Sequence, residues 1–421
     1  MSLKVLIDFK MSASRTEPLA KRPADPNQYL PAAKMARPSD AATAVVLTAS
    51  VRLSENRSHS CPDRGKRRRP FQMCFSRILT AAFATSTVGA ITLGAAMFKP
   101  DPVTAERDLE APPQAVSIGK RDHILVSGHS LTDQPYPDHL KGIARQEGIS
   151  VSLSLENVTG SSIQQRTGGG LVRLTDEPYN VLIITEQHRV LDALMWGETV
   201  RYLHGYHHAF TAANPAGTTY FYTPWISLSS LADPHPWIEY ERLALPVWRC
   251  VVNRVNDKMG AAGRKNHIRF IPTSLALAEL VARLASDPAF SGFEDWNAAD
   301  RLKAIFSDEV HLTELGSYYV AAVSFAAIYG ADIRQQRPPA LLDARQADAL
   351  RLFAADFMQG YQATKMNEVG DCEAPVSLAF ASHYANYVAR AYPREGSYLT
   401  TQLLRVRNIV RFAWRFRKGL E

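Results

Sequence analysis

The composition of the chain sets the first limits on what it can be. With 421 residues, 46% of them hydrophobic and 21% charged, it can bury a sizeable core in one large or two ordinary domains. Its formal net charge of +7 is concentrated early, because residues 1–105 contain 16 Lys and Arg against 7 Asp and Glu, whereas the remainder contains 32 against 34. This near balance removes the general electrostatic argument for a nucleic-acid binder, and we expect no such partner.

The N-terminal region is predicted to precede the folded part. Residues 1–72 lack sustained periodicity, which is typical of a disordered extension. Residues 73–105 are predicted to be a signal peptide or membrane anchor, because the uncharged run 78–98 is long enough to enter a bilayer. Small residues ending at Ala105 favour a cleaved signal over an anchor in the inner membrane. We therefore expect an exported protein, periplasmic or secreted.

Two features of this region leave alternatives open. The stretch RRPF, ending at Phe71, is similar to a twin-arginine export signal, but positive charge that merely flanks an apolar run explains it as well. A start at Met73 would give a short basic region directly before the apolar run. Residues 1–72 would then be a start-site artefact or a cytoplasmic extension.

The cysteines show no metal-binding pattern. Cys61 and Cys74 lie in the N-terminal region, and only Cys250 and Cys372 follow it, without CxxC or Cys/His spacing. An exported protein permits a disulfide between Cys250 and Cys372, and two separate buried thiols fit the sequence equally well.

Short β-rich runs alternate with helical segments from about residue 120 onwards. Most of these runs are separated by a segment long enough for a crossover helix, the pattern of a parallel sheet with helices on both faces. The expected strands are 123–128, 151–158, 180–185, 218–225 and 267–274, and the expected helices include 136–148, 188–214, 237–260 and 274–286. Ligands bind such sheets beyond the carboxyl ends of the strands, where Ser130, Gly160, Gln187 and Pro272 lie.

Ser130 has the partners that a nucleophilic serine needs. A hydroxyl becomes a nucleophile when a base removes its proton and a third group orients that base. Asp308 and His311 stand three residues apart, directly before an apolar helix, so one turn can present both side chains on the same side. The carboxylate can then hold the imidazole, and the helix anchors the pair to the core.

These blocks carry a family resemblance. "SGHSLTD" and "DEVHLTELG", within residues 122–330, resemble the first and last blocks of the SGNH, or GDSL-type, serine hydrolases. The resemblance implies a three-layer α/β/α fold with a flavodoxin-like parallel sheet over residues 120–335, and no metal or cofactor. It also implies a triad of Ser130, His311 and Asp308. "NVTGSS" matches the block whose glycine, here Gly160, donates to the oxyanion together with the Ser130 backbone N–H.

Two positions depart from the family pattern. His129 stands where an aspartate usually precedes the nucleophile, and "TEQH" puts Gln187 where an asparagine usually donates to the oxyanion. Glu186 could face the site in its place, since neighbouring strand residues point to opposite faces. His129 and Glu186 are therefore predicted to line the site, together with Trp225. That indole could stack on a sugar ring or could be an ordinary aromatic at the rim.

Three histidines, His204, His207 and His208, stand at helical spacing. A metal site would use such spacing, but no carboxylate or cysteine nearby in the sequence completes a ligand set, so a polar helix face is the preferred interpretation and no metal is predicted.

Residues 340–421 are predicted to form an appended helical segment. Residues 341–363 have the apolar spacing of an amphipathic helix. Near the C-terminus, arginines recur every four residues and apolar side chains occupy the other side, which fits a seat on anionic lipid or acidic polysaccharide, although a solvated face is the simpler explanation. The arginines are Arg407, Arg411 and Arg415, and the apolar residues are Val406, Ile409, Val410 and Ala413.

The sequence thus predicts an exported serine ester hydrolase that works through an acyl-enzyme. Its expected substrate is a small-molecule or polysaccharide ester, with acetyl groups on an envelope or extracellular carbohydrate preferred. An O-acyltransferase with the same triad is one alternative. A catalytically inactive carbohydrate-binding module on the same fold is another, suggested by the changes at His129 and Gln187. The oligomeric state is not predicted.

Overall fold

Five parallel strands form the centre of the computed structural model, which describes residues 121–170, 178–365, 376–392, 398–417 and 419–420. The strands are β1 (Arg121–Gly128), β2 (Ser150–Asn157), β3 (Val181–Thr185), β4 (Thr218–Tyr222) and β5 (Arg269–Ile271). They pair in the order β2-β1-β3-β4-β5, all in parallel. The five predicted strands and the flavodoxin-like sheet are thereby confirmed.

Burial along the strands follows from their place in the sheet. β3 lies at the centre, and its five residues, Val181 to Thr185, are all buried, as expected for a strand covered by helices on both faces. Most residues of β2, at one edge, are partly exposed. Ser127 of β1 pairs with Ile184 of β3, so the carboxyl ends of these two strands lie side by side.

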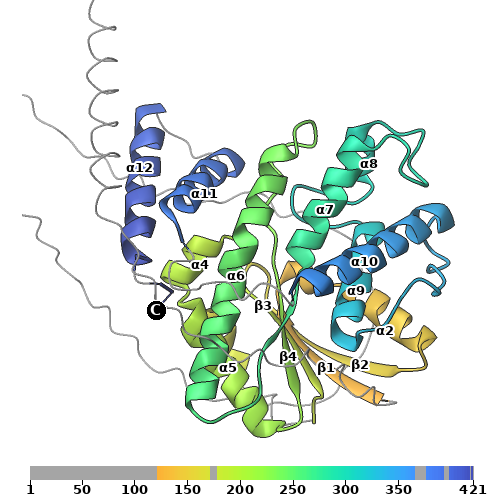
Figure 1. Cartoon of the computed structure of the whole chain (residues 1–421), viewed down its shortest axis with the longest axis horizontal. Helices are drawn as coiled ribbons and strands as arrows, with labels where there is room; N and C mark the ends of the chain where they lie inside the picture. The colour runs from red at the N-terminus through yellow and green to blue at the C-terminus, as the bar shows by residue number, and fades with distance from the viewer. Residues whose placement is uncertain (1–120, 171–177, 366–375, 393–397, 418, 421) are drawn as a thin grey trace, which may run out of the picture. The chain divides into compact units, whose positions relative to one another are not determined.

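Helices cover both faces of the sheet (Figure 1). The connection from β1 to β2 runs in the opposite direction along the sheet from those that lead to β3, β4 and β5. Because such crossovers are right-handed, α2 (Tyr136–Gln146) lies on the opposite face from α3 (Ile163–Gly170), α5 (Thr199–Ala213) and α6 (His235–Ala261). α9 (Glu314–Tyr329) packs beside α2, and α5 packs between α3 and α6. This is the predicted three-layer α/β/α arrangement.

The segment 188–214 forms two helices, whereas its pattern predicts one. α4 (Val190–Trp196) ends where the Gly197 N–H donates to the Ala193 carbonyl at 2.8 Å. Glu198 then takes a left-handed conformation with φ of 45°, and α5 begins at the next residue. A Cβ at position 197 would lie 2.8 Å from the Ala193 oxygen, so this tight end of α4 depends on glycine.

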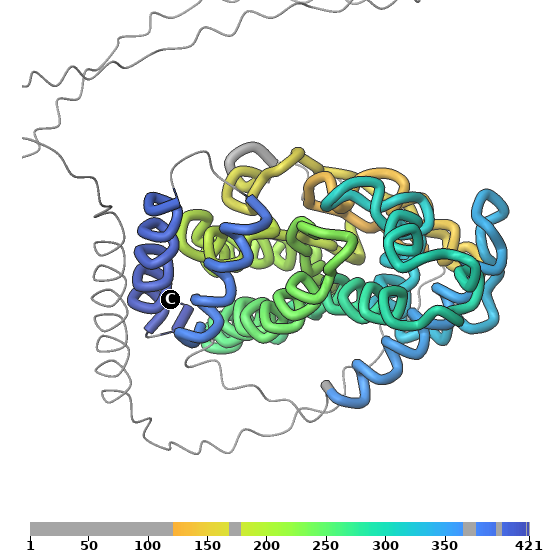
Figure 2. The backbone as a smooth tube through the Cα atoms, turned by 90° about the horizontal axis from the view of Figure 1, so that it is seen from above, coloured from red at the N-terminus to blue at the C-terminus, as the bar shows by residue number. Residues whose placement is uncertain are grey.

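The remaining helices surround these layers. α7 (Thr273–Ser286) packs on α6 and α9, and the short α8 (Ala298–Lys303) packs on α7. α10 (Ala344–Lys365) packs on α9, and α11 (Leu378–Ala391) packs on α6. α12 (Tyr398–Arg415) lies beside α11, at the opposite end of the domain from α10 (Figures 1 and 2). The sequence pattern does not single out α3, α8 and α11.

Several predictions concern residues outside those that the structure describes, namely 1–72, 73–105 with its apolar run 78–98, and Cys372. Within the described ranges, no helix is both long and apolar enough to cross a bilayer. All described residues belong to the unit Glu106–Glu421, and the boundary between the segments 120–335 and 340–421 stays a prediction. Cys250, buried on α6, is disulfide-bonded, so the alternative of a free buried thiol does not hold for it.

Candidate active site

The carboxyl ends of β1 and β3 lie side by side at the point where the chain connections reverse their direction along the sheet. Connections from β1 lead to one side of the sheet and those from β3 lead to the other, which is where open α/β sheets bind ligands. Ser130 follows β1, and Glu186 and Gln187 follow β3. The topology therefore brings these predicted residues to one region, although they are far apart in the sequence.

A tight turn holds Ser130 at the end of β1. The 3-10 helix η1 (Ser130–Thr132) begins directly after His129, and the backbone N–H and hydroxyl of Thr132 both donate to the His129 carbonyl, at 2.8 and 3.0 Å. A Cβ at Gly128 would lie 2.0 Å from the Thr132 hydroxyl oxygen, so the turn requires glycine there. Leu131 stays buried, while Ser130 is partly exposed. The turn thus presents one hydroxyl at the edge of the core.

His129 ties this turn to the end of β3. Its Nδ1 accepts the Leu131 N–H at 3.5 Å, and its Nε2 lies 3.0 Å from the Glu186 carbonyl oxygen, which assigns the ring proton to Nε2. Burial lowers the pKa of His129 to about 4, so the ring is neutral near pH 7. Because both nitrogens are occupied, His129 positions the turn and does not serve as a base for Ser130.

Asp308 and His311 form a tightly hydrogen-bonded loop before α9. The Asp308 Oδ1 accepts the backbone N–H groups of Val310 and His311, both at 2.7 Å, and its Oδ2 lies 2.7 Å from His311 Nδ1. Burial alone would raise the pKa of Asp308, but these N–H groups and the imidazole together lower it to about 2. The ionised carboxylate therefore accepts the Nδ1 proton and leaves Nε2 free to accept another.

Two contacts fix this loop against the segment that follows β4. The Trp225 indole N–H donates to the Val310 carbonyl at 2.8 Å, and the Leu228 N–H donates to the Glu309 carbonyl at 2.6 Å. Trp225 is fully buried. The prediction that it could stack on a sugar ring is therefore wrong, because packing against its neighbours leaves no exposed ring face; its role is to position the Asp308–His311 loop.

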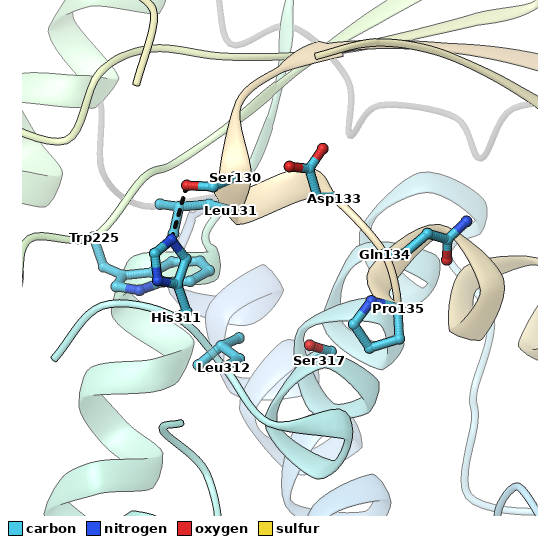
Figure 3. Close-up of a pocket in the computed structure, with 9 residues that line it drawn as sticks. All are labelled: Ser130, Leu131, Asp133, Gln134, Pro135, Trp225, His311, Leu312 and Ser317. Atoms are coloured by element: carbon cyan, nitrogen blue, oxygen red, sulfur yellow. Dashed lines mark hydrogen bonds between the residues drawn. The ribbon is translucent and has the colours of Figure 1, made fainter. Parts of the chain in front are cut away.

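The three residues of the predicted triad come together in the structure. Figure 3 shows His311 pointing at Ser130. His311 Nε2 lies 3.0 Å from the Ser130 Oγ, which gives an unbroken line of hydrogen bonds from Asp308 through His311 to Ser130. This geometry meets the requirements for a serine nucleophile with a general base and a group that orients the base. Whether these residues catalyse a reaction stays a prediction.

A pocket of about 270 Å³ opens beside Ser130. It lies between the η1–α2 connection and the start of α9, and Figure 3 shows its lining. The apolar part consists of Leu131, Pro135, Trp225 and Leu312, and the polar part of Ser130, Asp133, Gln134, His311 and Ser317. A substrate group could thus rest against apolar side chains while its polar atoms meet the rim.

Two of the predicted oxyanion donors, Gly160 and Gln187, lie outside this lining. Gly160 has φ of 67° and is the third residue of a turn closed by the Ser161 N–H on the Val158 carbonyl, at 3.0 Å, so it satisfies a backbone conformation that favours glycine. Gln187 is partly exposed, and its own N–H donates to the Glu186 carboxylate. The donor roles of Gly160 and Gln187 stay predictions.

Glu186 is turned into the interior and does not line the pocket. Its Oε1 accepts the N–H groups of Ile163 and Gln187, at 3.1 and 2.7 Å, and its Oε2 accepts the Thr199 hydroxyl at 2.9 Å. Burial raises the pKa of Glu186, while these donors and the nearby Arg166 charge oppose that change. The expectation that Glu186 lines the site is therefore wrong. Its bonds fix the connection between β3 and α3.

Sequence analysis missed Arg166, which joins three segments around the site. From α3, this buried guanidinium donates to the Ser127 hydroxyl at 3.1 Å, to the carbonyl and hydroxyl of Ser161 at 2.9 Å, and to the Thr185 carbonyl. Arg166 thereby connects the end of β1, the turn of Gly160 and the end of β3. No motif marks it, since its partners are mainly backbone oxygens and small hydroxyls.

Asn157, at the end of β2, was also missed. Its Oδ1 lies 3.2 Å from the Thr132 hydroxyl, and its Nδ2 donates to Asp133 at 2.7 Å. Asn157 therefore holds the last two residues of "SGHSLTD" in place. Its place three residues before Gly160, at a strand end, was the available signal.

The three neighbouring histidines divide between core and surface. His207 is buried, with Nδ1 2.9 Å from the Thr219 hydroxyl and Nε2 2.9 Å from the Asn266 carbonyl, so the polar face predicted for all three is wrong for this residue. No cluster of His, Cys, Asp and Glu suited to a metal ion occurs among the residues that the structure describes.

We expect Gln187→Ala to lower kcat by about a hundredfold with little change in KM, because losing one oxyanion donor costs about that much. Gln187→Asn should restore part of this rate if the shorter amide still reaches. Steady-state kinetics on an ester substrate measure both. Glu186→Gln is the control for a purely structural effect, since it disturbs buried hydrogen bonds and should lower the melting temperature. An unchanged kcat for Gln187→Ala would remove Gln187 from the oxyanion site.

Comparisons with known proteins give structural similarity at low identity. No family model and no curated protein sequence matches the chain. It is similar to a DUF4886 family protein from Bacteroides uniformis (14% identity, 57% of this chain and 96% of that chain, TM-score 0.42). It is also similar to a family 3 carbohydrate esterase from Clostridium thermocellum (16%, 49% and 94%, 0.32) and to an acetylxylan esterase from Geobacillus stearothermophilus (13%, 51% and 96%, 0.34). Function must therefore be inferred from this chain's own site.

Proposed function

We propose that the protein is a serine ester hydrolase that forms an acyl-enzyme on Ser130. The observation that carries this proposal is the continuous hydrogen-bonded line from Asp308 through His311 to Ser130, placed beside a pocket at the switch point of the sheet. The same order of residues, a serine after the first strand and Asp-x-x-His before a late helix, is that of the SGNH hydrolases which the chain resembles.

The geometry supports a two-stage reaction. In the first stage His311 Nε2 takes the Ser130 proton as Oγ attacks the acyl carbonyl, and the imidazolium then gives that proton to the departing alcohol. In the second stage His311 takes a proton from water, the hydroxide attacks the acyl-serine, and the proton returns to Ser130 as the acid leaves. Asp308 remains ionised throughout and stabilises the imidazolium.

The negative charge on the carbonyl oxygen needs donors in both stages. The Ser130 backbone N–H, the Gly160 N–H and the Gln187 amide are the proposed donors. The contacts of Arg166 support this arrangement, because it fixes the Gly160 turn through Ser161 and the start of the Gln187 segment through Thr185.

A short acyl group on a carbohydrate is the proposed substrate. At about 270 Å³ the pocket lies below the usual size of sites for drug-sized ligands, so it suits a compact group more than a long lipid chain. Asp133, Gln134 and Ser317 offer hydrogen-bonding partners for sugar hydroxyls at the rim. Stacking on Trp225 does not contribute, since that ring is buried.

The proposal also includes export of the protein. The apolar run 78–98 motivates it, and the disulfide at Cys250 is consistent with an oxidising compartment such as the periplasm.

Turnover of p-nitrophenyl acetate, butyrate and octanoate by the purified chain tests the proposal, with acetylated xylose and release of free acetate as a second assay. We expect hydrolysis that is fastest for the short chains. If an added sugar acceptor diverts the acyl group from free acid, the protein is an acyltransferase. Absence of any turnover would favour the inactive binding module.

A further inference from the structure

An apolar stripe runs along the exposed side of α12. Leu399, Leu403, Val406, Val410 and Trp414 are between 54% and 72% exposed. Their spacing of four, three, four and four residues puts them on one face of the helix. Such a row of large apolar side chains needs a partner, because folded proteins seldom leave extended apolar patches in water without a function.

Arginines border this stripe. Arg407, Arg411 and Arg415 are exposed and each directly follows one of the apolar residues Val406, Val410 and Trp414. Residues 398–417 contain five arginines and no Asp or Glu. Arg411 also lies over the ring of Trp196 on α4, 4.3 Å from its centroid, and that indole is itself exposed. The surface thus combines apolar side chains with positive charge.

The opposite side of α12 is fixed to the domain. Phe412 is buried and packs edge-on against the Tyr384 ring of α11 at 5.4 Å, while the Tyr384 hydroxyl donates to Asp192 of α4 at 2.7 Å. Phe412 therefore occupies the side of α12 that faces the domain. Val406 and Val410 lie on the exposed side.

We propose that this face of α12 docks on an anionic lipid surface. Leu403, Val410 and Trp414 would enter the boundary between headgroups and acyl chains while the arginines contact the phosphates. An acidic polysaccharide would satisfy the arginines but would not bury the apolar stripe. A second copy of α12 would bring five more arginines against these five.

α12 is linked through α11 to segments that lie next to candidate site residues. Tyr392, at the end of α11, stacks on His188 with ring centroids 6.0 Å apart, and its hydroxyl lies 2.9 Å from the Ser227 hydroxyl. α11 therefore links α12 to the segments that follow β3 and β4. The lipid proposal itself does not depend on ester hydrolysis.

Hydrogen exchange of the full chain, with and without vesicles, tests the proposal locally. We expect slower exchange in peptides covering 398–417 with phosphatidylglycerol vesicles and little change with phosphatidylcholine vesicles. A local measurement separates α12 from any binding by residues 78–98. Leu403→Glu/Val410→Glu should abolish the protection, and Arg407→Gln/Arg415→Gln should weaken binding about fivefold for each arginine removed.

Matched controls change exposed residues elsewhere. Leu341→Glu, at a position 88% exposed, and Lys265→Gln should leave the protection unchanged. Three results would overturn the proposal: no protection with either lipid; protection that rises with protein concentration alone, which would indicate a second copy; or protection before vesicles are added that disappears when 78–98 is altered, which would indicate the chain's own segment.

Discussion

Replacing Ser130 with alanine should abolish ester turnover, lowering kcat by about four to six orders of magnitude, and His311→Ala should have a similar effect. Without the hydroxyl no acyl-enzyme forms, and without the imidazole the proposed base, 3.0 Å from Ser130 Oγ, is lost. The two losses should not add, because each variant already removes the same chemical step. Steady-state kinetics on the singles and the double variant measure this.

Both variants should remain folded. Ser130 is partly exposed and the His311 side chain is 43% exposed, so neither fills the core, and we expect melting temperatures within a few degrees of the unaltered chain. Ser317→Ala provides a matched control, because it removes a hydroxyl from the same pocket without touching the hydrogen-bonded line. If Ser317→Ala lost as much activity as Ser130→Ala, or if Ser130→Ala stayed active, Ser130 would not be the nucleophile.

Asp308→Asn should lower kcat by about four orders of magnitude, because it changes which nitrogen of the His311 ring carries the proton. The side-chain oxygen of the asparagine would still accept the N–H groups of Val310 and His311, which leaves its NH₂ group facing His311 Nδ1. His311 Nδ1 must then accept a hydrogen bond from this NH₂ group, so the ring proton moves to Nε2. His311 would donate to Ser130 and could no longer take its proton.

Asp308→Ala separates two roles of Asp308, namely orienting the His311 ring and holding the shape of the Asp308–His311 loop. It removes all three hydrogen bonds, so we expect a comparable loss of activity together with a lower melting temperature, whereas Asp308→Asn should keep the loop intact. NMR of the His311 ring protons would report the tautomer directly. Retention of more than a tenth of the activity by Asp308→Asn would show that this carboxylate does not orient the base.

The sequence was sufficient to predict the sheet and the proximity of Ser130, His311 and Asp308 for physical reasons. Buried parallel strands need apolar β-rich runs, which made all five visible, and parallel topology gathers their carboxyl ends at one edge. Ser130, Asp308 and His311 could be assigned because the chemistry constrains their types and their order relative to strand and helix. The short connection between Asp308 and His311 made their contact almost local.

Residues whose roles depend on distant partners could not be predicted. Trp225 was placed near the site, where it contributes to the pocket lining, but its anchoring role could not be predicted because sequence does not show that Val310, 85 positions later, accepts its indole proton. Arg166 gave no signal, since it bonds to backbone carbonyls and to small hydroxyls. The side of α12 that packs on the domain could not be predicted either, because spacing alone does not show which side Phe412 anchors. In each case tertiary packing decided the outcome.

Covalent labelling with a fluorophosphonate tests the central claim most directly. This reagent phosphonylates a serine whose hydroxyl is activated by a neighbouring base, and mass spectrometry of the digested protein locates the label. We predict stoichiometric labelling of Ser130 that is lost in His311→Ala and slowed in Asp308→Asn, in the intact, folded chain. Absence of label from Ser130, or label on a different serine, would contradict the assignment of Ser130, His311 and Asp308 as a catalytic triad.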